Sequence, residues 1–284
     1  MKRIWTWLLG IVLATISSQL PAQADNLQRS ENGWFMAPHG QIHILVVYAE
    51  MKFDSSYGHL DPVKDPNGTI GWKVGKMPHW KQWLVSKTAS EEGWMTKYFR
   101  QASFGKFQVT GDVLDTIVTV PITDVRDGRG KIVESEAYAS NHYRQAVLTK
   151  LNAIKDPKFL FGSQLSDFDR WTYGGTGLPS TEKPNSKFDI VMIVWRNLHV
   201  PGLGEMSGFV NPGDIGSLWG SHTDMYSMFK TTSELPMVIM RHEFSHMLYG
   251  GNNFHTANGG VGTRTFMSTV GGWSNMSASD ACSP

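Results

Sequence analysis

The chain has almost no cysteine and no marked excess of charge of either sign. Cys282 is the single cysteine among 284 residues, so no disulfide can form within the chain. Lys and Arg total 26 against 25 for Asp and Glu, and this balance gives no electrostatic reason to expect nucleic acid as a partner. Aromatic residues are plentiful, with 11 Trp and 14 Phe, which indicates a chain that packs a core rather than a disordered one.

Beyond the N-terminus, no apolar run is long enough to span a bilayer. The largely apolar residues 4–16 follow Lys2 and Arg3, and they precede an A-x-A cleavage site that ends at Ala24. This order of positive, apolar and small residues is typical of a secretory signal peptide. We therefore expect residues 1–24 to be removed by cleavage after Ala24. The product would be a secreted or periplasmic protein without an integral membrane segment.

Residues 25–284 are sufficient for one large domain, or for two lobes around a cleft. Runs of β-branched and aromatic residues predict strands at 41–48, 106–111, 113–120 and 188–195. Helix-forming residues predict helices at about 94–102 and 134–154. Residues 165–187 are polar and contain Gly and Pro, which predicts a long surface loop.

One five-residue motif carries most of the chemistry. His242-Glu243-Phe244-Ser245-His246 has the spacing HExxH. Two histidines four residues apart lie on the same face of a helix, so both imidazoles can bind one tetrahedral Zn²⁺. Glu243 flanks the metal without binding it, which is the position of a general base for a metal-bound water. The motif thus predicts a zinc hydrolase.

The motif lies in a predicted helix that begins near Ser233 and ends near Gly250. Pro236 suits its first turn, and Gly250-Gly251 suits its end. Most of its circumference is apolar: Leu235, Met237, Val238, Ile239, Met240, Phe244, Met247 and Leu248. Such a helix is buried, and buried histidine and glutamate side chains are costly unless they are paired or bind a metal.

A catalytic zinc usually has three protein ligands and a fourth position for water. No Glu follows Glu243, which excludes the thermolysin-like class, where a later glutamate is the third ligand. The remaining candidates are His255 and Asp280. We favour His255, because imidazole suits zinc and the turn-forming residues 250–253 can bring the chain back toward the metal.

The zinc motif resembles that of the metzincin clan of endopeptidases, H-E-x-x-H-x-x-G-x-x-H followed by a turn that contains methionine. The chain departs from this pattern. Tyr249 and Asn252 stand at the glycine and third-histidine positions, and His255 comes three residues later. For the methionine turn we favour Met276, with Met267 as the alternative.

Other segments narrow the resemblance to immune-inhibitor-A-type peptidases. The sequence YFRQASFGKFQVTG at 98–111 is similar to a segment of that family, as are residues 45–48 and 167–171. The resemblance implies an α+β, metzincin-like catalytic domain, with a twisted mixed sheet above the cleft, an active-site helix and a small C-terminal lobe. The upper lobe would extend to about residue 250, and 251–284 would form a short or truncated C-terminal lobe.

The implied activity is that of a zinc-dependent endopeptidase acting on protein or peptide substrates. His242, His246 and His255 would hold Zn²⁺, which lowers the pKa of its water ligand to about 7. Glu243 would take the proton of this water and pass it to the leaving amine. A further hydrogen-bond donor to the oxyanion could be Tyr249, Tyr226 or His222, and the sequence does not choose among them. The substrate would bind as an extended strand along a sheet edge within residues 204–230.

Two alternative interpretations remain open. Asp167 and Asp169 suggest a Ca²⁺ loop, but Trp171 occupies the usual third acidic position, which favours a solvated loop. For the whole chain, the alternative to an enzyme is an exported adhesion or binding protein that holds zinc on an inactive zincin scaffold.

Overall fold

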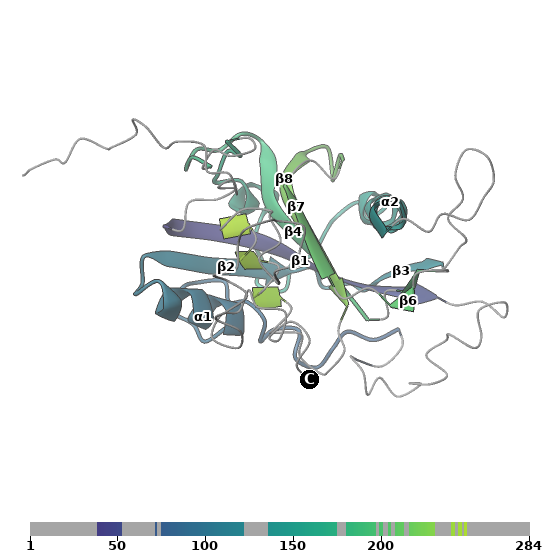
Figure 1. The fold of residues 1–284 in the computed structure, drawn as a ribbon, viewed down its shortest axis with the longest axis horizontal. Coiled ribbons are helices and arrows are strands. Elements are labelled where there is room, and N and C mark those ends of the chain that lie inside the picture. The colour runs from purple at the N-terminus through teal and green to yellow at the C-terminus, as the bar shows by residue number, and fades with distance from the viewer. Residues whose placement is uncertain are drawn as a thin grey trace, which may run out of the picture.

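The structure is a computed structural model that describes residues 39–52, 72, 75–121, 136–174, 180–196, 199–200, 204–205, 208–212, 216–230, 240–241, 244–245 and 247–248. It is α+β, with helices on both sides of a predominantly parallel sheet (Figure 1). The proposed signal peptide and the proposed C-terminal lobe, 251–284, lie outside the described residues.

Eleven helices, strands and turns have defined bounds within the described residues. They are β1 (Gly40–Lys52), α1 (Trp94–Ala102), β2 (Phe107–Val113), β3 (Val118–Pro121), α2 (Glu136–Asn152), the 3₁₀ turn η3 (Leu165–Phe168), β4 (Lys187–Trp195), β5 (His199–Val200), β6 (Gly204–Glu205), β7 (Gly208–Pro212) and β8 (His222–Lys230). The predicted strands at 41–48 and 188–195 and the predicted helices at 94–102 and 134–154 are present within a few residues of their expected bounds.

The six-stranded sheet has the order β2-β1-β4-β8-β7, and β3 also pairs with β1. β1 is 13 residues long, so its first part pairs with β2 and its last part with β3, both in parallel. The strand predicted at 106–111 is present as β2. Of the strand predicted at 113–120, only the last part is present, as β3, because β2 continues to Val113 and residues 115–117 are not extended. β4 and β8 continue the parallel sheet, whereas β7 is antiparallel to β8.

The sheet is buried on both faces, which explains why β1 and β4 are nearly continuous apolar runs. On one face, Leu45 and Val47 pack in a core with α2 residues such as Tyr143 and Leu151. On the other face, alternate residues of β1 pack in a second core with α1 and the indoles of Trp72 and Trp80. Figure 1 shows α1 and α2 on opposite sides of the sheet.

The helix that carries the zinc motif belongs to the core on the α1 side. Its described residues, here called the motif helix, are Met240, Arg241, Phe244, Ser245, Met247 and Leu248, and all are helical. Met240, Phe244 and Met247 are fully buried in that core. For these residues the prediction of a buried helix is confirmed.

None of the helices in the described part of the chain is long and apolar enough to cross a membrane.

The burial of the motif helix predicts that replacing Phe244 destabilises the protein much more than replacing Phe104. Phe244→Ala should lower the free energy of unfolding by about 3–5 kcal/mol, because it leaves a cavity among buried rings. Phe104 is 94% exposed, so Phe104→Ala should change it by less than about 0.5 kcal/mol. Urea unfolding followed by tryptophan fluorescence measures both. Similar stabilities for the two variants would contradict the packing of the motif helix.

Candidate functional site

The motif helix is held in place by aromatic contacts to α1 and β2. The ring of Phe244 lies 4.8 Å from the ring of Phe99 and 6.3 Å from that of Phe107, between centroids. The guanidinium carbon of Arg241 lies 4.7 Å from the centroid of the Tyr98 ring, which is a cation–π contact. Tyr98, Phe99 and Phe107 all come from residues 98–111, the segment that resembles immune-inhibitor-A-type peptidases.

The residues proposed to perform the chemistry lie outside the described residues. These are His242, Glu243, His246 and His255, with Asp280 as the alternative ligand and Met276 and Met267 as candidates for the methionine turn. The described neighbours of the motif nevertheless establish which side of the helix faces the sheet, because Met240, Phe244 and Met247 are buried in the core on the α1 side.

The predicted substrate edge has a structural counterpart in β7. Residues 208–212 form the last strand of the described sheet, antiparallel to β8, with Gly208 in register with Phe229 and Pro212 with Met225. An edge strand presents backbone N–H and C=O groups to a further extended chain. Proline is tolerated at such an edge. Among the described strands, β7 is thus at the end of the sheet, and its use by a substrate stays a prediction.

The candidate oxyanion donors are separated by the sheet register. His222 is the first residue of β8, is exposed, and is in register with Lys187. Position 226 is in register with Val191, and Val191 packs in the core on the α2 side. Tyr249 lies outside the described residues.

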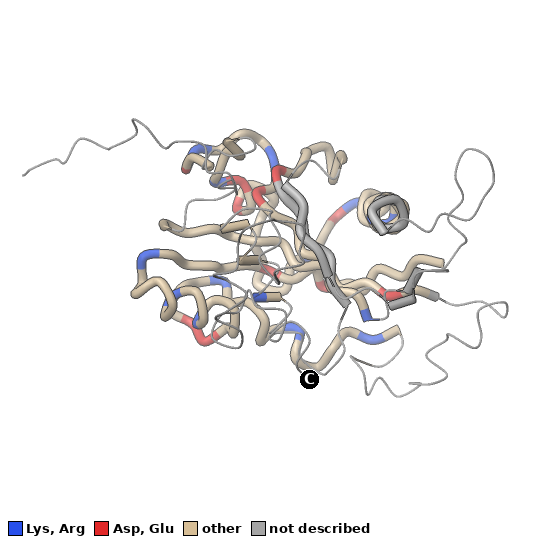
Figure 2. Tube along the Cα trace, viewed as in Figure 1, with Lys and Arg blue, Asp and Glu red and all other residues tan. Residues whose placement is uncertain are grey.

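The proposed Ca²⁺ pair is engaged with the backbone of its own loop. An Asp167 carboxylate oxygen accepts a hydrogen bond from the Gln164 backbone N–H at 2.8 Å. The two oxygens of Asp169 accept the backbone N–H groups of Asn185 and Ser186, each at 2.8 Å. Figure 2 shows acidic residues gathered where this loop meets the start of β4. Both carboxylates thus act as anchors of the loop.

Asp189 of β4 anchors the same loop from inside the protein. Its carboxylate accepts backbone N–H groups of Arg170 at 3.0 Å and of Trp171 at 2.8 Å. Burial raises the pKa of Asp189 to about 8; these two backbone hydrogen bonds oppose the rise, while the negative charges of Asp169 and Asp224 add to it. Asp189 is fully buried.

His43 lies in a buried polar network that no motif in the sequence indicates. Its Nδ1 is 2.9 Å from the hydroxyl of Thr110 on β2, and its Nε2 is 3.5 Å from the hydroxyl of Ser163. Asp112 accepts the Ser163 backbone N–H at 3.2 Å. Burial lowers the pKa of His43, and the nearby charges of Asp112 and Asp167 oppose this shift. Because Nδ1 contacts a hydroxyl rather than a carboxylate, this network lacks the orienting acid of a Ser–His–Asp triad.

Within the ranges that the structure describes, no group of three or more His, Cys, Asp or Glu residues is arranged to hold a metal ion. A comparison of the chain with models of known protein families gave no match, and neither did a comparison with curated proteins. The motif and the packing around it are therefore the features that bear on function.

The raised pKa of Asp189 predicts how stability changes with pH. The folded protein binds this proton more tightly than the unfolded chain, whose Asp has a pKa of 3.8. The contribution is therefore fully present below pH 3.8 and is lost as the pH rises toward 8. Asp189→Asn cannot ionise, so its stability should fall less than that of the wild type between pH 5 and pH 8.

Urea unfolding at several pH values measures this difference. The exposed Asp156 supplies the control, because Asp156→Asn should keep the pH profile of the wild type. A profile for Asp189→Asn that parallels the wild type throughout would show that the buried carboxyl group does not carry the effect.

Proposed function

We propose that the chain is a secreted zinc-dependent endopeptidase of the metzincin type. The observation that carries the proposal is the packing of the motif helix, which buries Met240, Phe244 and Met247 against the sheet. An HExxH sequence that arose by chance would have no reason to lie on a helix fixed in the core. The similarity of residues 98–111 to a peptidase segment adds support, because that segment supplies the rings that contact Phe244 and Arg241.

The helical period predicts where the histidines lie relative to this packing. Successive residues turn by about 100° around a helix axis. With positions 240, 244 and 248 toward the sheet, positions 242 and 246 are predicted on the opposite side, one turn apart. That arrangement suits two imidazoles that bind one metal ion from a single helix face.

The environment of the helix favours a metal over two solvated histidines. Ser245 lies well around the helix from the sheet-facing residues, yet it is only 1% exposed. The helix is therefore enclosed on more than its sheet side. Imidazole and carboxylate groups in such surroundings need partners. A zinc ion held by His242, His246 and His255 meets that need and is consistent with the donor set of catalytic zinc sites.

In the proposed peptide hydrolysis, each of these residues would have a distinct role. When bound, zinc supplies Lewis acidity toward the scissile carbonyl and toward water. Glu243 accepts the proton of the attacking water and delivers it to the leaving amine nitrogen. β7, the last strand of the described sheet, would pair with the substrate as an extended strand, which sets the peptide direction without requiring a particular side chain.

Replacement of the general base tests catalysis separately from metal binding. Glu243→Gln should lower the rate of casein hydrolysis by at least about 100-fold and should leave the zinc content near that of the wild type. Glu91 is an exposed glutamate far along the chain, and Glu91→Gln should retain full activity. A chelator should abolish the wild-type activity, and added zinc should restore it.

If the zinc-loaded wild-type protein cleaves neither casein nor a peptide library, the proposed endopeptidase activity is contradicted. It would favour the alternative of a zinc-binding adhesion protein on an inactive scaffold. Activity that persists in Glu243→Gln would remove Glu243 from its proposed role.

The third ligand is tested by metal content. His255→Ala should lower the zinc bound per chain after dialysis, because a site with two imidazoles binds zinc more weakly than one with three. Asp280→Ala should leave zinc binding unchanged. Elemental analysis of both variants measures this, and loss of zinc in Asp280→Ala alone would move the ligand to Asp280.

A further inference from the structure

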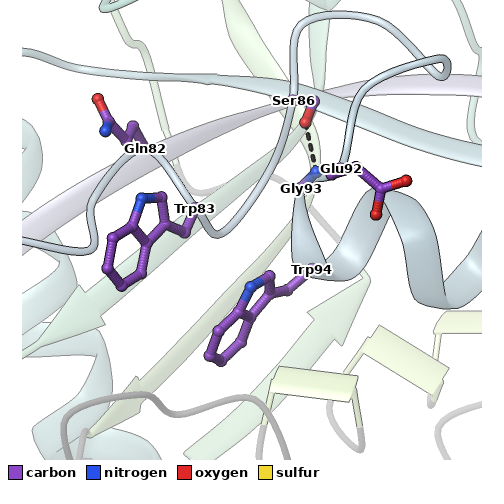
Figure 3. Close-up of a pocket in the computed structure, with 6 residues that line it drawn as sticks. All are labelled: Gln82, Trp83, Ser86, Glu92, Gly93 and Trp94. Carbon is purple, nitrogen blue, oxygen red and sulfur yellow. Dashed lines mark hydrogen bonds between the residues drawn. The ribbon is translucent and has the colours of Figure 1, made fainter.

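A small open pocket of about 390 Å³ lies at the start of α1. Figure 3 shows its lining residues, Gln82, Trp83, Ser86, Glu92, Gly93 and Trp94. The two indole rings lie on the same side of the contact between Ser86 and Gly93. The volume is near the lower end of the range for small-molecule pockets, roughly 300–1,000 Å³.

The backbone holds the two tryptophans in fixed positions. The Trp94 N–H donates to the Trp83 carbonyl at 2.8 Å, and the Met95 N–H donates to the Leu84 carbonyl at 2.9 Å. The Gly93 N–H donates to the Ser86 hydroxyl at 2.6 Å. A Cβ on Gly93 would lie only 2.5 Å from the Ser86 backbone nitrogen, so this close approach requires glycine. The pocket is thus formed before any ligand arrives.

The tryptophans are unusually exposed for their size. Trp83 is 44% and Trp94 is 40% exposed. Within the described part of the chain, Phe104 is the other exposed large hydrophobic residue, and it follows the opposite end of α1. Exposed aromatic surface that is held rigidly and grouped in a hollow is typical of a binding site.

The charges around the pocket argue against a cationic ligand. Glu92 is the one acidic residue of the lining, and its carboxylate is paired with Lys97 at 2.7 Å and with Arg100 at 3.8 Å. An aromatic site for a quaternary ammonium group would need negative potential that is not already neutralised. A neutral ligand fits these surroundings better.

We propose that Trp83 and Trp94 form a carbohydrate-binding site for a neutral, β-linked pyranose with equatorial hydroxyl groups. Such a ring presents axial C–H bonds on both faces, and the electron-rich face of an indole attracts these partially positive hydrogens. The exposed side chain of Gln82 also lines the pocket, and its amide can bond the hydroxyl groups.

An apolar peptide side chain is the main competitor, and the Gln82 amide disfavours it. Covering the Gln82 amide with an apolar group would remove water from it without supplying a new hydrogen bond, which costs free energy. A sugar ring covers the indoles and supplies hydroxyl groups at its edge, so it satisfies both parts of the pocket. The proposal does not depend on peptidase activity.

Titration of the full secreted chain with cellotetraose tests the site, with tryptophan fluorescence and saturation-transfer NMR as readouts. We expect saturable binding that weakens about tenfold in Trp83→Ala and in Trp94→Ala, because each variant loses one of the two stacking rings. Trp83→Phe and Trp94→Phe keep a ring and should lose less. Phe104→Ala removes the exposed aromatic outside the pocket and should bind like the wild type.

Two controls test whether binding is specific to the pocket and independent of the zinc motif. Sorbitol has hydroxyl groups but no ring face, so it should not bind. Glu243→Gln and the chelated wild type should bind cellotetraose unchanged, which makes failure of this site distinguishable from failure of the peptidase.

Several results would overturn the proposal. These are absence of saturable binding of cellotetraose to the folded wild type, and equal binding by the alanine and wild-type proteins. A third is binding of an apolar peptide, rather than the sugar, that depends on Trp83 and Trp94. Far-UV circular dichroism identifies any variant that has failed to fold, and the phenylalanine variants then decide the outcome.

Discussion

The contact of Phe244 with Phe99 and Phe107 is the interaction on which the proposed site depends. It joins the motif helix to α1 and β2, two consecutive elements that come much earlier in the chain. Burial of these rings removes a large apolar area from water, and it fixes the rotation of the motif helix about its axis. That rotation determines which side chains face the sheet and which face away. The proposed metal site would therefore depend on an apolar contact for its geometry.

α1 connects the two candidate sites of the protein. Its buried side carries Phe99 toward the motif helix, while Trp94 at its first residue remains exposed in the pocket. The amphipathic period of a helix allows one short element to serve both purposes. A change in α1 that alters its packing would be felt at both places, whereas removal of an exposed indole would affect the pocket alone. Both candidate sites thus depend on α1, but through different side chains of this helix.

The sequence predicted the elements whose signal is local and missed the arrangements that depend on distant partners. The apolar run of β4 and the helix-forming composition of α2 each lie within one segment, so both elements were predicted nearly to their bounds. The composition of 165–187 predicts a surface loop, yet Phe168 and Trp171 are buried within it. Their burial depends on Asp189, which reaches the loop backbone from β4. Likewise, the pocket requires Trp83 and Trp94 to meet across a turn, and no periodic pattern in the sequence indicates that meeting.

The case for zinc is stronger than the five-residue motif alone, because of how the motif helix is enclosed. A helix at the surface can direct histidine and glutamate side chains into water at little cost. Here Leu248 is 4% exposed and Ser245 is 1% exposed, although they lie at different angles around the axis. The described residues of the helix are therefore covered over a wide arc around its axis. Evolution rarely keeps two imidazoles and a carboxylate in such a place without a partner that offsets their desolvation. In the proposed site, a zinc ion would bind the two imidazoles, and Glu243 would pair with the water on that ion.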